Sequence, residues 1–289
     1  MELKHIANRT GRLSSFLREE MGMSLGLMNR LKWQDKLFVN GVPQRTNYQV
    51  QPGDVITAAL EEAAPEYPAE DGALTILYED DYLLAVDKPA GMLIHPSRAT
   101  MQGTLANRVT AYYQKTGQSC AFHPITRLDR DTFGIVLLAK NSHIHAKFTQ
   151  MQEEGALQKT YQALVFGCPE ENAGIIDAPI ARRPLPSLLR YVNQEGKPSV
   201  TRFTVLERYT GYSRLSLQPV TGRTHQLRVH CAHIGCPILG DPQYNTPEST
   251  AFSQAFQLSY QLLCAKSLDF PHPITGASMH LESQLSPQL

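Results

Sequence analysis

The first 60 residues combine short helical patterns with turn signals. Between 12 and 18 the apolar residues repeat at helical spacing, and 24–31 holds a second such pattern that begins at a Ser, a favoured helix cap. An apolar triplet at 37–39 leads into Asn-Gly at 40–41, which favours a tight hairpin turn. The pattern therefore predicts a small α/β body of two helices and a short sheet over residues 1–60.

This apolar pattern disappears between 61 and 73. The stretch reads EEAAPEYPAEDGA and has neither a helical nor a strand period. Such a composition cannot bury enough apolar surface to fold alone. We expect a flexible acidic linker here, which joins residues 1–60 to a larger body over 74–289.

The larger body alternates strand patterns with helix patterns. The apolar run after Gly134 is long enough for a fully buried strand. A helix is predicted from a Ser142 cap to Gly155, and a second one from a Thr224 cap to Gly235. The predicted strands cover 74–78, 82–87, 135–139, 159–165, 199–209 and 212–220.

Two histidines, His143 and His145, fall early in the first of these helices. Ile144, Phe148 and Met151 make its apolar face, and the two histidines lie on or near the polar face. We therefore expect both imidazoles to be solvated.

One segment concentrates charge beside the buried strand. The stretch 122–141 reads FHPITRLDRDTFGIVLLAKN, so Arg-Leu-Asp-Arg-Asp directly precedes the apolar run. Charges next to a core strand cost free energy unless they pair or take part in chemistry. Two surface ion pairs are the simple interpretation, because exposed pairs are common and contribute little. The alternative is a reactive site that contains Asp129.

Composition narrows the possible function classes. The chain has 289 residues, of which 42% are hydrophobic, as in an ordinary globular protein. No apolar stretch approaches the roughly 20 residues of a membrane span. The N-terminus lacks the apolar core of a secretory signal, which predicts a cytoplasmic protein. Five Cys form no CxxC pair and no even set, so we expect reduced thiols and no zinc site.

The net charge is zero, but the charge is distributed unevenly. Residues 1–54 carry eight basic and five acidic residues, 55–81 carry eight acidic and no basic ones, and 82–289 carry 19 basic and 14 acidic ones. Two mildly basic bodies joined by an acidic segment can bind one anionic ligand together. Nucleic acid is therefore a candidate partner.

Two other kinds of site fit the sequence poorly. The spacing of His225, His230 and His233 does not put three imidazoles on one helical face, so no metal site is expected. A glycosidase pair of Asp129 and Asp131 needs one protonated carboxyl group, but the flanking Arg residues would hold both carboxylates ionised. We expect Asp131 to pair with a neighbouring Arg or to cap the turn.

Four motifs in order resemble those of the RluA-like RNA pseudouridine synthases. They are KPAGMLIHP at 88–96, HPITRLDRDTFG at 123–134, KTYQALV at 159–165 and GRTHQLRVH at 222–230, within a similarity over about 74–280. The resemblance implies an α+β fold with a mixed, mostly antiparallel central sheet and flanking helices. It also implies isomerisation of uridine to pseudouridine in structured RNA, either rRNA or tRNA.

The resemblance assigns a role to individual residues. It implies that Asp129 is the catalytic carboxylate, that Arg228 is the cation paired with it, and that Tyr161 stacks on the uracil. The base has to leave its stack for this chemistry. The reaction needs no redox group, phosphate or group donor, so no cofactor is expected. Further RNA contacts are expected from Arg127, Arg223, His225 and His95.

Residues 9–60 resemble the RNA-binding module of the small-subunit ribosomal protein S-four. The matching parts are RLSSFL, FVNG and PGD. This resemblance implies that the small body binds RNA, with Arg12, Arg30 and Lys32 as candidate contacts. Without the resemblance, a small basic pair of helices is equally compatible with a plain docking domain.

The sequence thus predicts a monomeric, cytoplasmic RNA pseudouridine synthase whose partner is RNA. The alternative from another class is a non-catalytic RNA-binding or ribosome-assembly factor on the same fold. In that case loss of Asp129 would leave function intact. The modified uridine is not encoded in these motifs, because the target is recognised through RNA shape.

Overall fold

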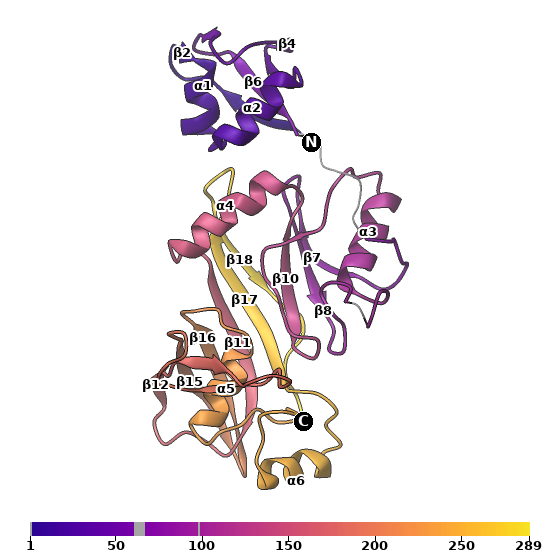
Figure 1. Cartoon of the computed structure of the whole chain (residues 1–289), viewed down its shortest axis with the longest axis vertical. Coiled ribbons are helices and arrows are strands. Elements are labelled where there is room, and N and C mark those ends of the chain that lie inside the picture. The colour runs from indigo at the N-terminus through magenta and orange to yellow at the C-terminus, as the bar shows by residue number, and fades with distance from the viewer. Residues whose placement is uncertain (1, 61–66, 98) are drawn as a thin grey trace.

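The computed structural model describes residues 2–60, 67–97 and 99–289. Figure 1 shows a small N-terminal body at one end of an elongated body that is built on a single large sheet. The predicted α+β fold with a mixed, mostly antiparallel sheet is confirmed. Among the described helices, none is both long and apolar enough to cross a bilayer.

The N-terminal body packs helices on a four-stranded sheet, as its apolar pattern predicts. Phe16, Leu17 and Leu31 are fully buried between the two layers. Ser24 caps α2, and its Oγ accepts a hydrogen bond from the Leu27 N–H at 3.2 Å. The sheet has the order β1 (Glu2–Ile6), β6 (Val55–Ala59), β3 (Leu37–Val39), β4 (Val42–Pro43); the other elements are β2 (Gly11–Arg12), α1 (Leu13–Ser15), the π-helical turn η1 (Phe16–Glu20), α2 (Leu25–Trp33) and β5 (Gln49–Val50).

The described part of the predicted linker, residues 67–73, is held against α3 (Leu105–Lys115). The Asn107 side chain donates to the Pro68 carbonyl at 2.8 Å, and Arg108 donates to the Ala73 carbonyl at 2.8 Å. These bonds tie this half of the segment to the larger body, which a free, solvated linker would not show. Residues 61–66 lie outside the described residues, and the division into domains stays a prediction.

The large sheet holds ten strands, and neighbouring strands pair antiparallel with one exception, β10 beside β17. The strand order is β12 (Ala173–Asp177), β15 (Val200–Tyr209), β16 (Tyr212–Pro219), β11 (Gln158–Phe166), β17 (Leu263–Pro271), β10 (Phe133–Ala139), β8 (Leu83–Lys88), β7 (Thr75–Glu79). Two further strands lie off this order: β18 (Ser278–Glu282) pairs with β17, and β9 (His123–Pro124) pairs with β10.

The apolar run in β10 is explained by layers on both of its faces. One face packs against Ile144 and Phe148 of α4 (Ser142–Glu153), whereas the other packs against Leu105 and Val109 of α3. Every residue of β10 is buried. A strand covered on both sides loses the alternation of apolar and polar residues, as the sequence of this strand does.

The parallel contact between β10 and β17 covers two residue pairs, Phe133 with Cys264 and Gly134 with Ala265. Gly134 has φ +105°, and a Cβ there would overlap the Ala265 carbonyl oxygen, so glycine is required at this position. The charged loop at 127–131 leads into β10 at this same point, so its charges are placed where the two halves of the sheet meet.

The helix caps and one histidine differ from the sequence-based expectation. Asn141, not Ser142, caps α4, because its side chain accepts the Ile144 N–H at 2.9 Å. Thr224 does not cap α5 (Gln226–His233), whose first position is preceded by His225 at φ +58° with no side-chain cap. The expected exposure of His143 is wrong, since this side chain is buried at 5% exposure.

His143 is buried because α4 supports the N-terminal body. The imidazole hydrogen-bonds the Met21 backbone, and Tyr82 and Ile274 of the larger body pack against the core of the smaller one. Its Nε2 is buried without a hydrogen-bond partner among the described residues. Burial and, to a smaller extent, the Lys147 ammonium lower the pKa of His143, and the hydrogen bond to Met21 opposes them; the net pKa is about 4.

Acid is therefore expected to weaken this contact. Because the pKa of His143 is lower in the folded protein than in the unfolded chain, its stabilising contribution is complete above about pH 6.5 and is lost as the pH falls toward 4. The loss should reach about 3 kcal/mol at pH 4. Urea unfolding of wild type and His143→Gln between pH 7 and 4 measures it. The control is His280→Gln, at a solvent-exposed pair with Asp269. Equal pH slopes for wild type and His143→Gln would contradict the assignment.

Candidate active site

A buried lysine fixes the charged loop at 127–131. Lys88, at the end of β8, is fully buried, and its Nζ donates to the carbonyls of Pro89 at 3.0 Å, Met92 at 2.8 Å and Arg130 at 2.8 Å. Burial lowers the pKa of Lys88 to about 8, and the carboxylates of Asp131 and Asp129 oppose this shift. The first sequence motif therefore holds the second one in place.

Within the loop, Asp131 and Arg130 form the ion pair that the sequence predicts. The Arg130 Nε and one terminal nitrogen donate to the two carboxylate oxygens, each at 2.9 Å. Both carboxylate oxygens of Asp131 are thus engaged by Arg130. Asp129 is the carboxylate of the loop that faces the rest of the site.

Asp129 meets Arg228, which arrives on α5 almost 100 residues later. One Arg228 nitrogen donates to Asp129 Oδ2 at 3.1 Å, and 33% of the Asp129 side chain remains exposed. The resemblance predicts that Asp129 and Arg228 pair, and the structure places them in contact.

Arg228 is itself held by residues that sequence reasoning missed. Its Nε and one terminal nitrogen donate to the two carboxylate oxygens of Asp241 at 2.7 and 2.8 Å, and the same terminal nitrogen donates to Gln243 Oε1 at 2.8 Å. The guanidinium carbon lies 4.9 Å from the centre of the Tyr244 ring. Burial lowers the pKa of Arg228, but Asp241 and Asp129 raise it above its usual value, so the charge is permanent.

A signal for Asp241 was present in the sequence. The residue follows the buried pair Ile238-Leu239 and stands between Gly240 and Pro242, so it is a charge in a tight turn beside the core, like the loop around Asp129. No local pattern names its partner, because Arg228 lies on a separate helix.

His225 also lies in this site, at a left-handed backbone position. Its Nδ1 is 2.8 Å from Tyr244 Oη, and its Nε2 is 3.8 Å from Asp129 Oδ2. The Arg190 N–H donates to the same Tyr244 oxygen at 2.9 Å. We assign the hydroxyl hydrogen to His225 Nδ1, which leaves the hydrogen of the neutral ring on Nε2, toward Asp129.

Charge states around Asp129 follow from burial. Burial lowers the pKa of His225, the Asp129 carboxylate opposes this and Arg228 adds to it, so the ring is neutral at pH 7. In the described part of the chain, both His225 and Arg228 contact Oδ2 of Asp129. Neither of these two contacts involves Oδ1.

Tyr161 comes from β11, opposite Leu217 on one side and Ala265 on the other. Its side chain is half-buried between the two largest apolar clusters of the sheet. Burial raises the pKa of its hydroxyl, and the nearby Asp129 carboxylate raises it further. The phenol is thus a neutral ring within electrostatic range of Asp129.

The remaining candidates lie at different distances from this centre. Arg127 is exposed and close enough to Lys159 of β11 to lower its pKa, after the larger effect of burial. Arg223 is exposed and donates to the Pro198 carbonyl at 3.2 Å. His95 lies 3.2 Å from Tyr67 Oη and packs edge-on to Phe122.

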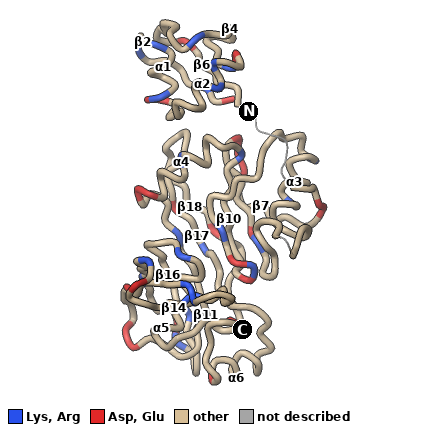
Figure 2. Tube along the Cα trace, in the orientation of Figure 1, with Lys and Arg blue, Asp and Glu red and all other residues tan. Residues whose placement is uncertain are grey.

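Arg12, Arg30 and Lys32 belong to the N-terminal body, which lies beyond α4 and at the opposite end of the molecule from α5 (Figure 1). Lys32 stacks over the Trp33 ring at 5.0 Å. Figure 2 shows further basic residues gathered around β14 (Arg190–Val192), β16 and β17, near the site. Basic side chains are therefore present both at the site and at the far end of the molecule.

The described residues contain no group of three His, Cys, Asp or Glu side chains that could hold a metal ion. The groups that meet at Asp129 are this carboxylate, the Arg228 guanidinium and the rings of His225 and Tyr161. These groups can hold a negative charge at a fixed place beside a flat, neutral surface.

Residues 82–233 match the family model described as RNA pseudouridylate synthase. This chain belongs to that family. It is 37% identical over 254 residues to an uncharacterized RNA pseudouridine synthase, YlyB, of Bacillus subtilis. The aligned region covers 86% of this chain and 82% of the relative. It is 34% identical to ribosomal large subunit pseudouridine synthase D of Pseudomonas aeruginosa, with 86% and 80% covered.

Solved structures agree with this assignment. Human RNA pseudouridylate synthase domain containing 1 superposes with a TM-score of 0.59 at 25% identity and covers 76% of this chain and 94% of its own. The protein is an RNA pseudouridine synthase, and the reaction of its family is the isomerisation of uridine in RNA. RNA is accordingly its substrate.

The buried charges around Arg228 predict a large effect on the stability of this synthase. Asp241→Asn removes the fully buried carboxylate that neutralises Arg228, and the free energy of unfolding should fall by about 3 kcal/mol in urea. Glu207→Gln is the matched control, because it removes the solvent-exposed carboxylate partner of Arg214 and should cost less than about 1 kcal/mol. Similar losses for the two variants would show that the Arg228 pair is not a stabilising element.

Proposed function

We propose that Asp129 is the catalytic carboxylate for uridine isomerisation in structured RNA. The observation that carries this proposal is the contact of a partly exposed Asp129 with a guanidinium that is buried and clamped by Asp241. A carboxylate that is hydrogen-bonded to a fixed cation has its orientation set before substrate binds. Oδ1, which is outside the contacts to His225 and Arg228, is the oxygen presented to substrate.

The reaction explains why such a carboxylate is needed. The bond from ribose C1′ to N1 breaks, the uracil turns, a bond forms from C1′ to C5, and the proton on C5 is lost while N1 gains one. An ionised carboxylate serves as nucleophile or as the counter-charge of the sugar cation. In both roles the Arg228 guanidinium would hold the carboxylate in place.

Base flipping and recognition of the uracil are assigned to the groups around Asp129. The target base has to leave its helix to reach the partly buried Asp129 carboxylate. The neutral Tyr161 ring supplies a stacking surface, because base stacking on an aromatic ring needs no particular base edge. Arg127, Arg223, His225 and His95 are proposed to contact RNA, His225 from within the site.

The proposed RNA is rRNA of the large ribosomal subunit. This follows from the printed names of three relatives, each 34–36% identical, which are ribosomal large subunit pseudouridine synthases D. Sequencing of pseudouridines in cellular rRNA and tRNA, with and without this protein, identifies the target. We also infer that the enzyme is a cytoplasmic monomer without a cofactor.

Asp129→Asn tests the catalytic role. The variant should bind RNA with near wild-type affinity but form no detectable pseudouridine, because an amide cannot carry the negative charge. Tritium release from [5-³H]uridine-labelled RNA measures turnover, and filter binding measures affinity. Asp269→Asn, at an exposed pair with His280, is the control and should remain active. Turnover by Asp129→Asn would show that Asp129 is not needed for the chemistry.

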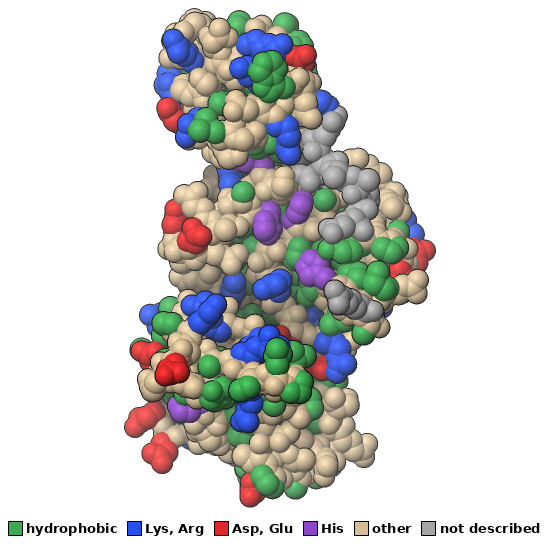
Figure 3. All heavy atoms as spheres, in the orientation of Figure 1, with side chains coloured by type: hydrophobic (Ala, Val, Ile, Leu, Met, Phe, Trp, Pro, Cys, Tyr) green, Lys and Arg blue, Asp and Glu red, His purple; other side chains and the backbone are tan. Residues whose placement is uncertain are grey.

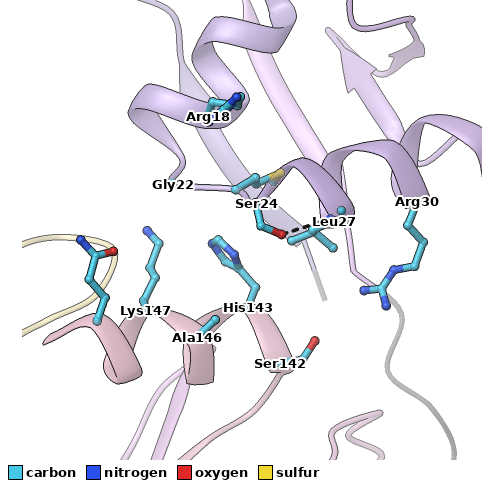
Figure 4. Close-up of a pocket in the computed structure, with 12 residues that line it drawn as sticks. Arg18, Gly22, Ser24, Leu27, Arg30, Ser142, His143, Ala146 and Lys147 are labelled. Atoms are coloured by element: carbon cyan, nitrogen blue, oxygen red, sulfur yellow. Dashed lines mark hydrogen bonds between the residues drawn. The ribbon is translucent and has the colours of Figure 1, made fainter. Parts of the chain in front are cut away.

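We propose that the N-terminal body, with its S-four-like sequence, is a second RNA grip. A cavity of about 570 Å³ lies between it and α4, and its twelve lining residues include Arg18, Arg30 and Lys147 but no acidic residue. Figure 4 shows Arg30 directed toward the cavity from one side and Lys147 and His143 from the other. Burial lowers the pKa of Lys147, and its Nζ donates to the Pro273 carbonyl at 3.1 Å.

Removal of positive charge from this cavity should weaken RNA binding without slowing the chemical step. In Arg18→Gln/Arg30→Gln the slope of log affinity against log salt should decrease by about 1 to 2, because two phosphate contacts are lost. Turnover at saturating RNA should stay unchanged. Lys4→Gln/Arg45→Gln is the matched control in the same body and outside the cavity. An unchanged slope for the first pair would mean that the cavity does not hold RNA.

A further inference from the structure

The hairpin of β13 (Ile180–Arg182) and β14 carries two leucines into solvent. Leu185 is 77% exposed and Leu188 is 67% exposed, both in the turn at 183–189 that we call the hairpin tip. Single exposed apolar residues are common, but two at one tip form a small apolar surface that water solvates poorly. The tip therefore has an apolar surface available for a partner.

The tip is a structured turn. The Arg183 N–H donates to the Leu189 carbonyl at 3.0 Å, and the Ser187 N–H donates to the Pro184 carbonyl at 3.1 Å. Leu189 turns inward and packs with the apolar cluster around Tyr244. The backbone thus separates Leu189, which anchors the hairpin, from its neighbour Leu188, which projects.

The base of the hairpin is attached directly to the active site. The Arg190 N–H binds Tyr244 Oη, Tyr244 binds His225 and covers the guanidinium of Arg228, and Arg228 binds Asp129. The position of the tip is therefore coupled to the position of the carboxylate through a short chain of rigid contacts.

The charge of the hairpin selects the kind of partner. Residues 178–194 contain three Arg and no acidic residue. These are Arg182, Arg183 and Arg190, at the two ends of the tip. Figure 3 shows basic and hydrophobic side chains next to one another on this half of the molecule. A nucleic acid fits both features, because its phosphates are anionic and its bases present flat apolar faces.

We propose that the hairpin tip is a wedge that opens the RNA stack beside the target uridine. Leu185 and Leu188 enter the gap between neighbouring bases, while Arg182 and Arg183 bind the flanking phosphates. Apolar side chains inserted at a base step replace part of the stacking that is lost when the helix is opened. The inference rests on the proposed function, since a wedge next to Asp129 serves a base that has to leave its helix.

The test compares a paired RNA with an unpaired one. Leu185→Ser/Leu188→Ser is assayed on an rRNA stem in which the wild type forms pseudouridine, and on the same strand without its complement. The rate on the paired stem should fall by about tenfold, the equivalent of one lost stacking contact, and the rate on the single strand should change by less than about twofold.

Ile175→Ser/Leu206→Ser is the matched control, because these two residues are 64% and 45% exposed on β12 and β15, away from the tip. It should leave both rates unchanged. A second measurement uses 2-aminopurine next to the target uridine. Wild type should raise its fluorescence on binding the stem, and the tip variant should bind with a smaller rise.

Each result bears on the wedge separately from the catalytic proposal. Equal rate losses on both RNAs would overturn the wedge and make the tip a part of the catalytic site. Unchanged rates and fluorescence would overturn it and leave the tip free to bind a protein. If the wild type formed no pseudouridine in any cellular RNA, the proposed function would fail before the variants were compared.

Discussion

The shared guanidinium of Arg228 is the interaction on which the rest of the site depends. One buried cation lies between a fully buried carboxylate, Asp241, and a partly exposed one, Asp129. Because a buried charge without a partner is costly, the cation cannot move away from either carboxylate without a large loss of stability. Asp241 and Gln243 accept hydrogen bonds from Nε and one terminal nitrogen of the guanidinium. The other terminal nitrogen is left to donate to Asp129. Stability and the placement of the reactive group thus have the same origin.

A second buried cation acts on the other side of Asp129. Lys88 binds backbone carbonyls of two loops, and its charge is balanced by nearby carboxylates rather than by a direct ion pair. The loop at 127–131 is consequently held at its backbone by β8 and at its side chain by α5. Both supports meet where β10 and β17 pair over two residues. The Asp129 carboxylate is therefore held by elements from both halves of the sheet.

The surfaces that are proposed to bind RNA differ in character from this rigid centre. The hairpin tip and the two arginines that line the cavity beside α4, Arg18 and Arg30, are exposed, and their removal should leave the fold intact. The centre is buried, and its charges are paired within the protein. Such a division lets one fixed reactive site serve different RNA shapes, since the surfaces around it can vary without changes to the ion pairs that hold the carboxylate.

Local pattern in the sequence was enough to predict the buried strand β10, the small N-terminal α/β body and the loop that contains Asp129, because apolar period and turn chemistry act over a few residues. The resemblance of four motifs added the pairing with Arg228. Only the tertiary structure decided that Asp241 and Tyr244 clamp this arginine, that Lys88 ties two loops together and that His143 is buried. Periodicity defines which face of an element is apolar, but not which distant element covers it, and the partner of a buried charge is set by that packing.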